Sequence, residues 1–333
     1  MTTTTRQIQL TARPQGRPQP SDFRTVEVEL PDPADGQVLV RNTVLSVDPY
    51  MRGRMNDVKS YVPAYGLDEP LEGGAVGVVE QSTSEDVPVG ATVQHMAGWR
   101  EHAVLDAGQV RVLDTDAAPA SAYLGALGMP GLTAWVGLTA IAPVTDGDRV
   151  FVSGAAGAVG SLAGQIARRL GASKVIGSAG SADKTAWLRE IGYDVALDYT
   201  AAPIGSQLRD HGPVDVYFDN VGGDHLEAAI QHSADFARFA LCGGIAGYDT
   251  PVPGPRNMML AVARRLTLRG FIVSDHAELA GEFYRTVGPW LASGEVTYRE
   301  TVLEGLDRTV EGFLGLGEGA NTGKMLIRLD TAE

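Results

Sequence analysis

The stretch VFVSGAAGAVGSLAGQIARRL, residues 150–170, decides the fold of this chain. It opens with an apolar, β-type run from Val150 to Val152, which leads into a glycine-rich turn. Beyond the turn, apolar residues recur at the spacing of a helix, namely Val159, Leu162, Ala163, Ile166 and Leu170. The pattern predicts a strand, a tight turn and a helix, in that order.

The glycines of this turn fit a dinucleotide-binding fingerprint. Gly157 and Gly160 occupy the second and third positions of G-x-G-x-x-G, and Ala155 occupies the first. Small residues here let a pyrophosphate approach the backbone amides at the positive N-terminus of the helix. The glycine pattern alone would be weak, but strand, turn and helix together predict a nucleotide site.

The second predicted strand indicates which dinucleotide binds. Lys174–Gly177 leads into Ser178-Ala-Gly-Ser181, where an NAD-binding unit usually has an Asp or Glu for the ribose 2′-hydroxyl. No acid stands there, and Lys184 supplies a cation for a 2′-phosphate, which favours NADP(H) over NAD(H). The alternative is a plain strand-to-helix connection, with Ser181 capping the next helix and Lys184 exposed to water.

The composition is that of a globular protein with room for two domains. The chain has 333 residues, of which 44% are hydrophobic and 20% are charged. Its formal net charge of −14 argues against nucleic acid and anionic membranes as partners, because both repel an acidic surface. A charge that only keeps the surface solvated is the simpler interpretation.

Cysteine content and the first residues predict a cytoplasmic protein. Cys242 is the single cysteine, so it forms no internal disulfide, and the six histidines show no metal-type clustering. A reducing compartment fits this composition. The opening Met-Thr-Thr-Thr-Thr-Arg lacks the apolar core of a signal peptide, and no run approaches the ~18 apolar residues of a membrane span.

The chain changes character near residue 120. Residues 6–115 hold β-type runs punctuated by Pro and Gly, at 23–30, 37–45, 75–79 and 91–95. From about Ser121 helices alternate with short apolar strands, as in a doubly wound parallel sheet. The candidate strands there are Arg149–Ser153, Lys174–Gly177, Val214–Asp219, Ala237–Leu241 and Leu266–Ile272.

The last third of the chain is expected to hold one long helix and then a closing strand. A helix after Ser274 would place Leu279, Phe283, Val287 and Leu291 on one face and end near Gly294. The tail at residues 322–329 has strand character. We expect this strand to return to the β-rich first domain and complete it.

Five further motifs carry a resemblance to a known family. They are DPYMRGRM at 48–55, LEGGAVG at 71–77, LGMPGLTA at 127–134, FDNVGG at 218–223 and CGGIAGY at 242–248. With the glycine-rich turn, they resemble the zinc-independent branch of the medium-chain dehydrogenase/reductase superfamily. That branch contains prostaglandin and leukotriene reductases, plant alkenal double-bond reductases and bacterial curcumin reductase. The likeness covers nearly the whole chain.

The resemblance implies a particular architecture. It is an α/β protein with a β-rich, GroES-like domain at residues 1–124, a Rossmann domain at 125–300 and a return to the first domain at 301–333. NADP(H) would lie in the cleft between the two domains. The resemblance alone also implies a homodimer.

No metal is expected. Zinc-dependent members of this superfamily need Cys, His and a Gly-His-Glu segment for one metal and a four-Cys lobe for another. This chain has one Cys, and Glu72-Gly73-Gly74 stands where Gly-His-Glu would be. Without a Lewis acid, the expected chemistry shifts from alcohols and carbonyls to activated alkenes.

The resemblance also implies a set of residues that contact the cofactor. Gly157, Ala158, Val159 and Gly160 would touch the pyrophosphate, and Lys184 and Tyr199 would hold the 2′-phosphate. Asn220 would bond the ribose or nicotinamide region, Asn321 would lie on the nicotinamide side, and the backbone of Phe271, Ile272 and Val273 would contact the carboxamide. The other expected cofactor contacts are Cys242, Gly243, Gly244, Ile245, Ala246, Gly247 and Tyr248. Simpler interpretations remain: Asn220 as a turn former, Asn321 as a loop residue and Tyr199 as a half-buried core aromatic.

One departure from the family bears on the phosphate site. The family commonly has Asn-Tyr-Lys around the phosphate-binding tyrosine, whereas this chain has Asp198-Tyr199-Thr200. An acid has been added and a cation lost. If the Asp198 carboxylate faces the site, its repulsion of a 2′-phosphate would weaken NADPH binding.

Three tyrosines are the candidates for contact with substrate. Tyr61 and Tyr248 match the family's substrate-contacting tyrosines, and Tyr50 stands in the DPYM motif. A phenol can donate a hydrogen bond to a carbonyl oxygen that gains charge as hydride arrives. For Tyr50 a turn with a packed aromatic is an equal alternative. Arg52 and Arg54 are expected to be structural ion-pair partners.

The sequence therefore predicts hydride transfer from NADPH to the β-carbon of an α,β-unsaturated ketone or aldehyde. Tyr248 and its neighbours would stabilise the resulting enolate until the α-carbon is protonated. A quinone reductase on the same scaffold is the nearest alternative. A non-enzymatic, NADPH-binding regulatory protein is a third, although such a protein could lose Tyr248 and Asn321, and both are present.

Overall fold

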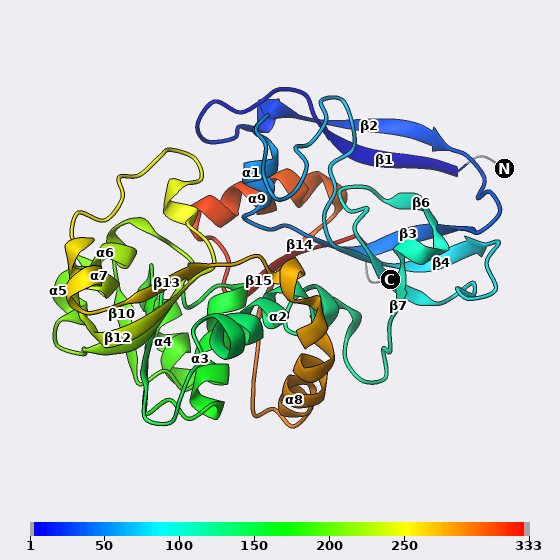
Figure 1. The fold of residues 1–333 in the computed structure, drawn as a ribbon. Coiled ribbons are helices and arrows are strands. Elements are labelled where there is room, and N and C mark those ends of the chain that lie inside the picture. The colour runs from blue at the N-terminus through cyan, green and yellow to red at the C-terminus, as the bar shows by residue number, and fades with distance from the viewer. Residues whose placement is uncertain (1–2, 330–333) are drawn as a thin grey trace. The chain divides into compact units, whose positions relative to one another are not determined.

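Two units of the chain each enclose their own hydrophobic core. The structure is a computed structural model, and it describes residues 3–329. The first unit runs up to Leu124 and also includes Glu300–Asn321 and, among the described residues, 325–329. The second unit consists of Gly125–Arg299 and Thr322–Lys324. Figure 1 shows the elements of both units.

The second unit is built on a six-stranded parallel sheet of order β10-β9-β8-β11-β12-β13. The chain fills the sheet outward from β8 in one direction and then from β11 in the other, which is the doubly wound Rossmann order. The fold class predicted from the sequence is confirmed. The strands are β8 (Arg149–Val152), β9 (Lys174–Ala179), β10 (Val195–Asp198), β11 (Val214–Asp219), β12 (Ser233–Leu241) and β13 (Thr267–Gly270).

Five of these strands confirm the predicted ones, β11 with the predicted bounds and the other four with shifted ends. The sequence pattern does not predict β10, because Val195-Ala-Leu-Asp198 is short and includes Ala and Asp, which are poor strand formers. The helices of this unit are α2 (Met129–Val136), α3 (Ala158–Arg169), α4 (Ala182–Glu190), α5 (Ile204–Leu208), α6 (Gly223–Gln231), α7 (Met259–Ala263) and α8 (Ala280–Ala292).

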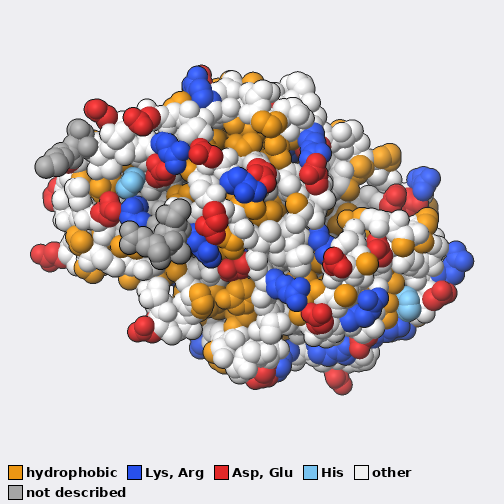
Figure 2. All heavy atoms as spheres, turned by 180° about the vertical axis from the view of Figure 1, so that it is seen from behind, with side chains coloured by type: hydrophobic (Ala, Val, Ile, Leu, Met, Phe, Trp, Pro, Cys, Tyr) orange, Lys and Arg blue, Asp and Glu red, His pale blue; other side chains and the backbone are white. Residues whose placement is uncertain are grey.

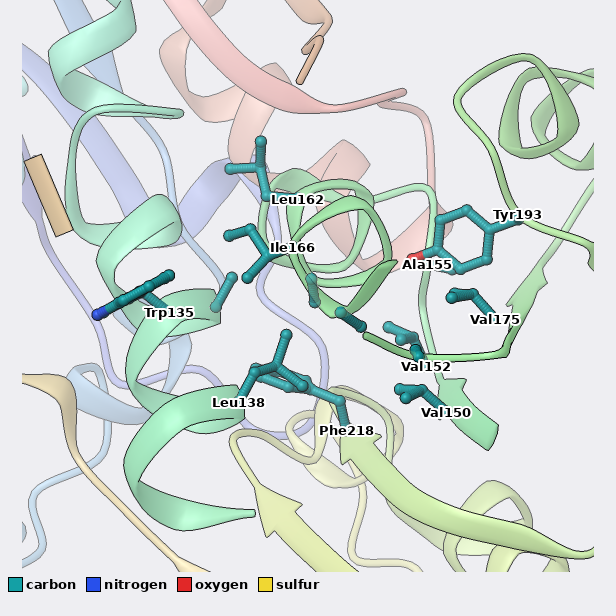
Figure 3. Close-up of a cluster of buried hydrophobic side chains, with 14 of the residues drawn as sticks. Trp135, Leu138, Val150, Val152, Ala155, Leu162, Ile166, Val175, Tyr193 and Phe218 are labelled. Carbon is teal, nitrogen blue, oxygen red and sulfur yellow. The ribbon is translucent and has the colours of Figure 1, made fainter. Parts of the chain in front are cut away.

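Alternate residues of β8 belong to different cores because side chains on a strand point to opposite faces. Val150 and Val152 lie with Leu162 and Ile166 of α3 in the cluster drawn in Figure 3. Phe151 lies in the other cluster and stacks on Tyr217 at 5.1 Å between ring centroids. Both faces of the sheet are therefore buried, as parallel sheets require.

The long helix predicted after Ser274 is present but begins later. Residues Val273–Leu279 form 3₁₀ turns, and the α-helix α8 starts at Ala280. Its predicted inner face is confirmed by the complete burial of Phe283 and Val287. The helix ends before Gly294, whose φ of +74° is the left-handed conformation common just past a helix C-terminus.

The first unit is β-rich. Its larger sheet has the order β14-β15-β3-β4-β5-β7, β6 pairs with β3, and β1 and β2 form a separate antiparallel pair. Its strands are β1 (Thr3–Leu10), β2 (Phe23–Leu30), β3 (Gln37–Ser46), β4 (Ala75–Ser82), β5 (Thr92–His95), β6 (His102–Asp106), β7 (Arg111–Val112), β14 (Glu300–Glu304) and β15 (Lys324–Arg328). Its helices are α1 (Met51–Arg54) and α9 (Thr309–Glu318).

Aromatic packing and the returning tail close the first unit. Trp99 stacks on Phe23 with ring centroids 5.9 Å apart and meets Phe313 of α9 edge-on at 5.8 Å. The tail strand β15 runs antiparallel to β3, with Leu326 opposite Ser46. The tail strand thus adds to the larger sheet of the first unit.

The surface carries charges of both signs. Figure 2 shows acidic and basic side chains interspersed on one face of the molecule. Many form exposed ion pairs, such as Arg24 with Asp68 and Arg41 with Glu80. Within residues 3–329, no helix has both the length and the apolar character needed to cross a membrane.

Candidate cofactor-binding and active site

The predicted cofactor residues of the second unit follow the carboxyl ends of its parallel strands. The glycine-rich turn follows β8, Gly180 follows β9, Tyr199 follows β10 and Asn220 follows β11. Cys242 follows β12, and Phe271 follows β13. Because the strands are parallel, these ends share one edge of the sheet. The strand order reverses between β8 and β11, where open α/β sheets bind their ligands.

The turn after β8 brings backbone amides to the start of α3. Gly154 has a φ of +58°, a conformation that favours glycine, and the amide of Ala155 donates to the Ser178 carbonyl at 2.8 Å. Gly157 precedes the helix and has no side chain to cap the first turn. The first amides of α3, from Ala158 onward, therefore have no intrahelical acceptor and can bind an anion.

Gly160 and Gly157 of the fingerprint lack a side chain for different reasons. A Cβ on Gly160 would lie 2.5 Å from the Gly154 carbonyl oxygen and 2.7 Å from Ala155 Cα, so the protein's own packing requires glycine there. A Cβ on Gly157 would meet only the Gly154 oxygen, at an ordinary 3.4 Å. The space that this missing Cβ leaves is open to a phosphate, so the turn fits a bound dinucleotide.

Gly180, Tyr199 and Lys184 form the far end of the candidate site. A Cβ on Gly180 would lie 2.5 Å from the Tyr199 hydroxyl, so the phenol lies over the end of β9. Ser181 caps α4 by accepting from the amide of Lys184 at 3.3 Å, which agrees with the alternative interpretation of this connection. Lys184 is half-buried rather than fully exposed, and burial lowers the pKa of its ammonium group.

Asp198 is engaged by its own turn. Its carboxylate accepts from the backbone amide of Thr200 at 2.9 Å and from the Thr200 hydroxyl at 2.6 Å. Both bonds lower the pKa of Asp198, and the bond from the hydroxyl has the larger effect. Burial, and then the nearby Asp198 charge, raise the pKa of Tyr199. The two donors thus favour the charged form of the carboxylate, which lies close to the Tyr199 phenol.

Asp219 organises the switch point, and sequence reasoning did not assign it a role. It ends β11 with 2% exposure, and its Oδ1 accepts from the hydroxyls of Ser153 at 3.0 Å and Tyr217 at 2.7 Å. The same oxygen accepts from the amides of Val221 at 3.0 Å and Gly222 at 2.8 Å. One carboxylate therefore joins the ends of β8 and β11 to the turn before α6.

Asn220 is tied into the same junction. Its amide nitrogen Nδ2 donates to the Ser153 carbonyl at 2.8 Å, and its backbone amide donates to the Ser153 hydroxyl at 2.9 Å. These bonds support the simpler interpretation of Asn220 as a turn former. Because Nδ2 is used in this way, the carbonyl oxygen of the side chain is the group that Asn220 offers to a ligand.

The backbone of the segment Cys242–Tyr248 is hydrogen-bonded to the turn that follows β11. The amides of Cys242 and Gly243 both donate to the Asp219 carbonyl at 2.9 Å, and Ala246 donates to Val221 at 3.1 Å. Burial raises the pKa of the Cys242 thiol to about 12, so the thiol is unreactive. A Cβ on Gly243 would lie 3.3 Å from the Tyr248 hydroxyl, so this phenol turns back over the end of β12.

Phe271–Val273 and Asn321 are the remaining predicted cofactor contacts. Phe271 packs edge-on against Phe218 with centroids 6.4 Å apart, and Ile272 and Val273 that follow it are half-buried. Asn321 belongs to the first unit and directly precedes Thr322–Lys324 of the second. There the amide of Gly323 donates to the Ala156 carbonyl at 2.8 Å, against the glycine-rich turn.

Tyr50 and Tyr61 belong to the first unit and lie near one another. Burial, and then the charge of Asp48, raise the pKa of Tyr50, so its phenol remains a hydrogen-bond donor at neutral pH. Tyr50 packs on the core of this unit, whereas Tyr61 is 62% exposed. Tyr50 thus packs on the core, as the turn interpretation expects, while an exposed tyrosine such as Tyr61 is available to a ligand.

The two arginines of the DPYMRGRM motif have structural roles, as expected. Arg54 is buried, lies 4.1 Å from the Tyr65 ring centroid and pairs with Glu72 at 2.7 Å. Arg52 donates to the Gly16 carbonyl at 2.6 Å. Glu72, the first residue of the segment that stands in place of Gly-His-Glu, is thereby an ion-pair partner. Among the residues that the structure describes, no group of three or more His, Cys, Asp or Glu could hold a metal ion.

Comparison with known proteins gives matches over both units. Residues 6–113 match a family model described as the N-terminal domain of oxidoreductase, and residues 158–292 match one described as zinc-binding dehydrogenase. A Bacillus subtilis (strain 168) protein, named as an NADP-dependent oxidoreductase, is 44% identical over 99% of both chains.

Two further matches have names that specify a cofactor or substrate. The NADPH-dependent curcumin reductase of Escherichia coli (strain K12) is 37% identical over 96% of this chain and 95% of its own. The crystal structure of CurA in complex with NADPH from Vibrio vulnificus superposes with a TM-score of 0.93, at 38% identity over 98% of this chain and all of that one. The chain belongs to the zinc-independent branch of the medium-chain dehydrogenase/reductase superfamily, together with curcumin, prostaglandin and 2-alkenal reductases.

Proposed function

We propose that this protein uses NADPH to reduce the carbon–carbon double bond of α,β-unsaturated ketones and aldehydes. The observation that carries the proposal is the position of the Tyr248 hydroxyl. It lies over Gly243, at the same edge of the parallel sheet where the glycine-rich turn follows β8. A phenol at this edge is placed to donate to a substrate oxygen. One relative is named 2-alkenal reductase, and a 2-alkenal is an α,β-unsaturated aldehyde.

NADPH, when bound, supplies the hydride. The amides that open α3 would bind its pyrophosphate, and the half-buried Lys184 and the Tyr199 phenol over Gly180 would bind the 2′-phosphate. Asn220 offers its side-chain oxygen at the switch point, and Phe271–Val273 and Asn321 are assigned to the nicotinamide side. These contacts fix the cofactor's orientation, which is the main contribution that a protein makes to such a reaction.

The reaction balances without a metal. Hydride adds to the β-carbon, the alkene electron pair moves toward the carbonyl oxygen, and an enolate forms. Tyr248 donates a hydrogen bond to that oxygen and stabilises its growing charge. Water then protonates the α-carbon and leaves as hydroxide, so the products are a saturated carbonyl compound, NADP⁺ and hydroxide. Tyr61 and Tyr50 are assigned to contact with the substrate.

The proposal includes a cytoplasmic homodimer. β13 ends the six-stranded sheet, so one of its edges has no strand beside it within this unit. Met259 and Val262 of the neighbouring α7 are 75% and 67% exposed. An open strand edge beside exposed apolar side chains is suited to pairing with a second copy. A single, half-buried cysteine suits a reducing compartment.

A substrate panel tests the proposed function. Enones, 2-alkenals, quinones and alcohols would be assayed with NADPH and with NADH by the change in absorbance at 340 nm. We expect turnover of enones and 2-alkenals with NADPH, and product analysis should show a saturated carbonyl. Turnover of quinones alone would favour the quinone reductase alternative. Binding of NADPH without turnover of any class would favour the regulatory protein.

Lys184→Ala should impair the use of NADPH far more than that of NADH. Of the groups of the cofactor, the ammonium would contact only the 2′-phosphate, which NADH lacks. Loss of a charge-assisted bond of ~1.5–3 kcal/mol corresponds to a rise of about 10- to 150-fold in KM for NADPH. Lys174→Ala is the matched control, because Lys174 opens β9 at the opposite end and its ammonium donates to the His211 carbonyl. Equal KM changes for both cofactors in Lys184→Ala would contradict the assignment.

A further inference from the structure

Tyr193 packs between α3, the helix that follows the glycine-rich turn, and the strand β9. It stands in the connection between α4 and β10, and its side chain is 3% exposed. A Cβ on Gly164 of α3 would overlap the Tyr193 ring, and one on Gly177 of β9 would lie 2.6 Å from it. Two glycines, on different elements, thus make room for this ring. Figure 3 shows the ring beside Ala155 and Val175.

The Tyr193 hydroxyl binds the backbone of the first turns of α3. It donates to the Gly160 carbonyl at 2.6 Å. In an α-helix this carbonyl also accepts from the backbone amide four residues later, so the phenol adds a second donor to it. The phenol therefore binds a carbonyl in the turn that opens the candidate pyrophosphate site.

Gly160 is consequently fixed from two sides. The backbone of Gly154 and Ala155 leaves no space for a Cβ on it, and the Tyr193 hydroxyl holds its carbonyl. The amides of Ala158, Val159 and Gly160 belong to this same turn. Any shift of Gly160 would move the donors that a pyrophosphate needs, and a preorganised site binds more tightly than one that must be ordered.

We propose that Tyr193 is a positioning residue that holds the start of α3 in the geometry that binds the cofactor's pyrophosphate. The inference rests on the proposed use of NADPH. It differs from a role in core packing, because a phenylalanine would fill the same space. It also differs from the role of Lys184, because the pyrophosphate is common to NADPH and NADH.

Tyr193→Phe tests the inference with little risk to folding. Without the hydroxyl, the Gly160 carbonyl can still accept from the Gly164 amide along the helix, so no buried polar group is left without a partner. Dissociation constants would be measured by titration for NADPH, for NADH and for 2′-AMP, which carries the 2′-phosphate and no pyrophosphate. We expect Kd to rise about three- to tenfold for both dinucleotides, the range for one hydrogen bond, and to stay unchanged for 2′-AMP.

Tyr123→Phe is the matched control. Tyr123 is also buried, and its hydroxyl donates to the Asp114 carbonyl at 2.7 Å in the first unit. The substitution Tyr123→Phe should leave the dissociation constants for NADPH, NADH and 2′-AMP unchanged. Amide hydrogen exchange over residues 158–164 gives a second measure, and we expect it to become faster in Tyr193→Phe alone.

The outcomes separate the inference from the proposed function. Unchanged dinucleotide binding in Tyr193→Phe, or an equal loss of 2′-AMP binding, would overturn the positioning role while NADPH binding by the wild-type chain still supported the proposed function. A wild-type chain that bound no dinucleotide would overturn both.

Discussion

Asp219→Ala should lower the free energy of unfolding by about 3–5 kcal/mol, because it leaves several buried donors without an acceptor. The hydroxyls of Ser153 and Tyr217 are fully buried, and both donate to Oδ1 of Asp219. The amides of Val221 and Gly222 lose the same acceptor. Urea unfolding followed by circular dichroism measures the change.

The same substitution should also weaken NADPH binding. Asp219 joins the end of β8 to the Asn220–Gly222 turn, so its loss would free both sides of the switch point. Asp215→Ala is the control on the same strand. Asp215 accepts from Arg149 at the other end of β11 and is more exposed, so its pair should contribute only about 0–1 kcal/mol. Equal effects of the two substitutions would contradict the special role of Asp219.

The glycine-rich turn could be predicted because its determinants are local. The apolar run of β8, the glycines and the periodicity of α3 lie within one short stretch, and each restricts the backbone where it stands. The strand β10 could not be predicted in this way. Two of its four residues, Ala196 and Asp198, are poor strand formers, and β10 exists because it pairs in parallel with β9.

The interior of the candidate site was less predictable than its outline. Asp219 and Tyr193 have functions that depend on residues far away in sequence, such as Ser153 for the carboxylate and Gly164 for the ring. One signal was available for Asp219, since an acid that ends an apolar strand must find partners when it is buried. For Tyr193 no local pattern exists, because an aromatic after a helix is equally typical of ordinary core packing.

Tyr248→Phe should lower kcat for enone reduction while leaving the affinity for NADPH nearly unchanged. The substitution removes only the hydroxyl, which lies over Gly243 and is assigned to the substrate oxygen. Loss of one oxyanion donor commonly lowers kcat by about 10²–10³-fold, and the loss would be smaller if water replaced the phenol. The ring would still pack at the end of β12, so the backbone of Cys242–Gly247 should keep its geometry.

The measurement that decides the role of Tyr248 is the rate of a single turnover at saturating substrate, because it isolates hydride transfer from product release. Tyr284→Phe is the control, since Tyr284 is also half-buried in the second unit and donates to the Leu127 carbonyl at 3.1 Å. If Tyr248 stabilises the enolate, only Tyr248→Phe slows this step. An unchanged rate would mean that the phenol contributes packing and no chemistry, and enolate stabilisation would have to come from another donor.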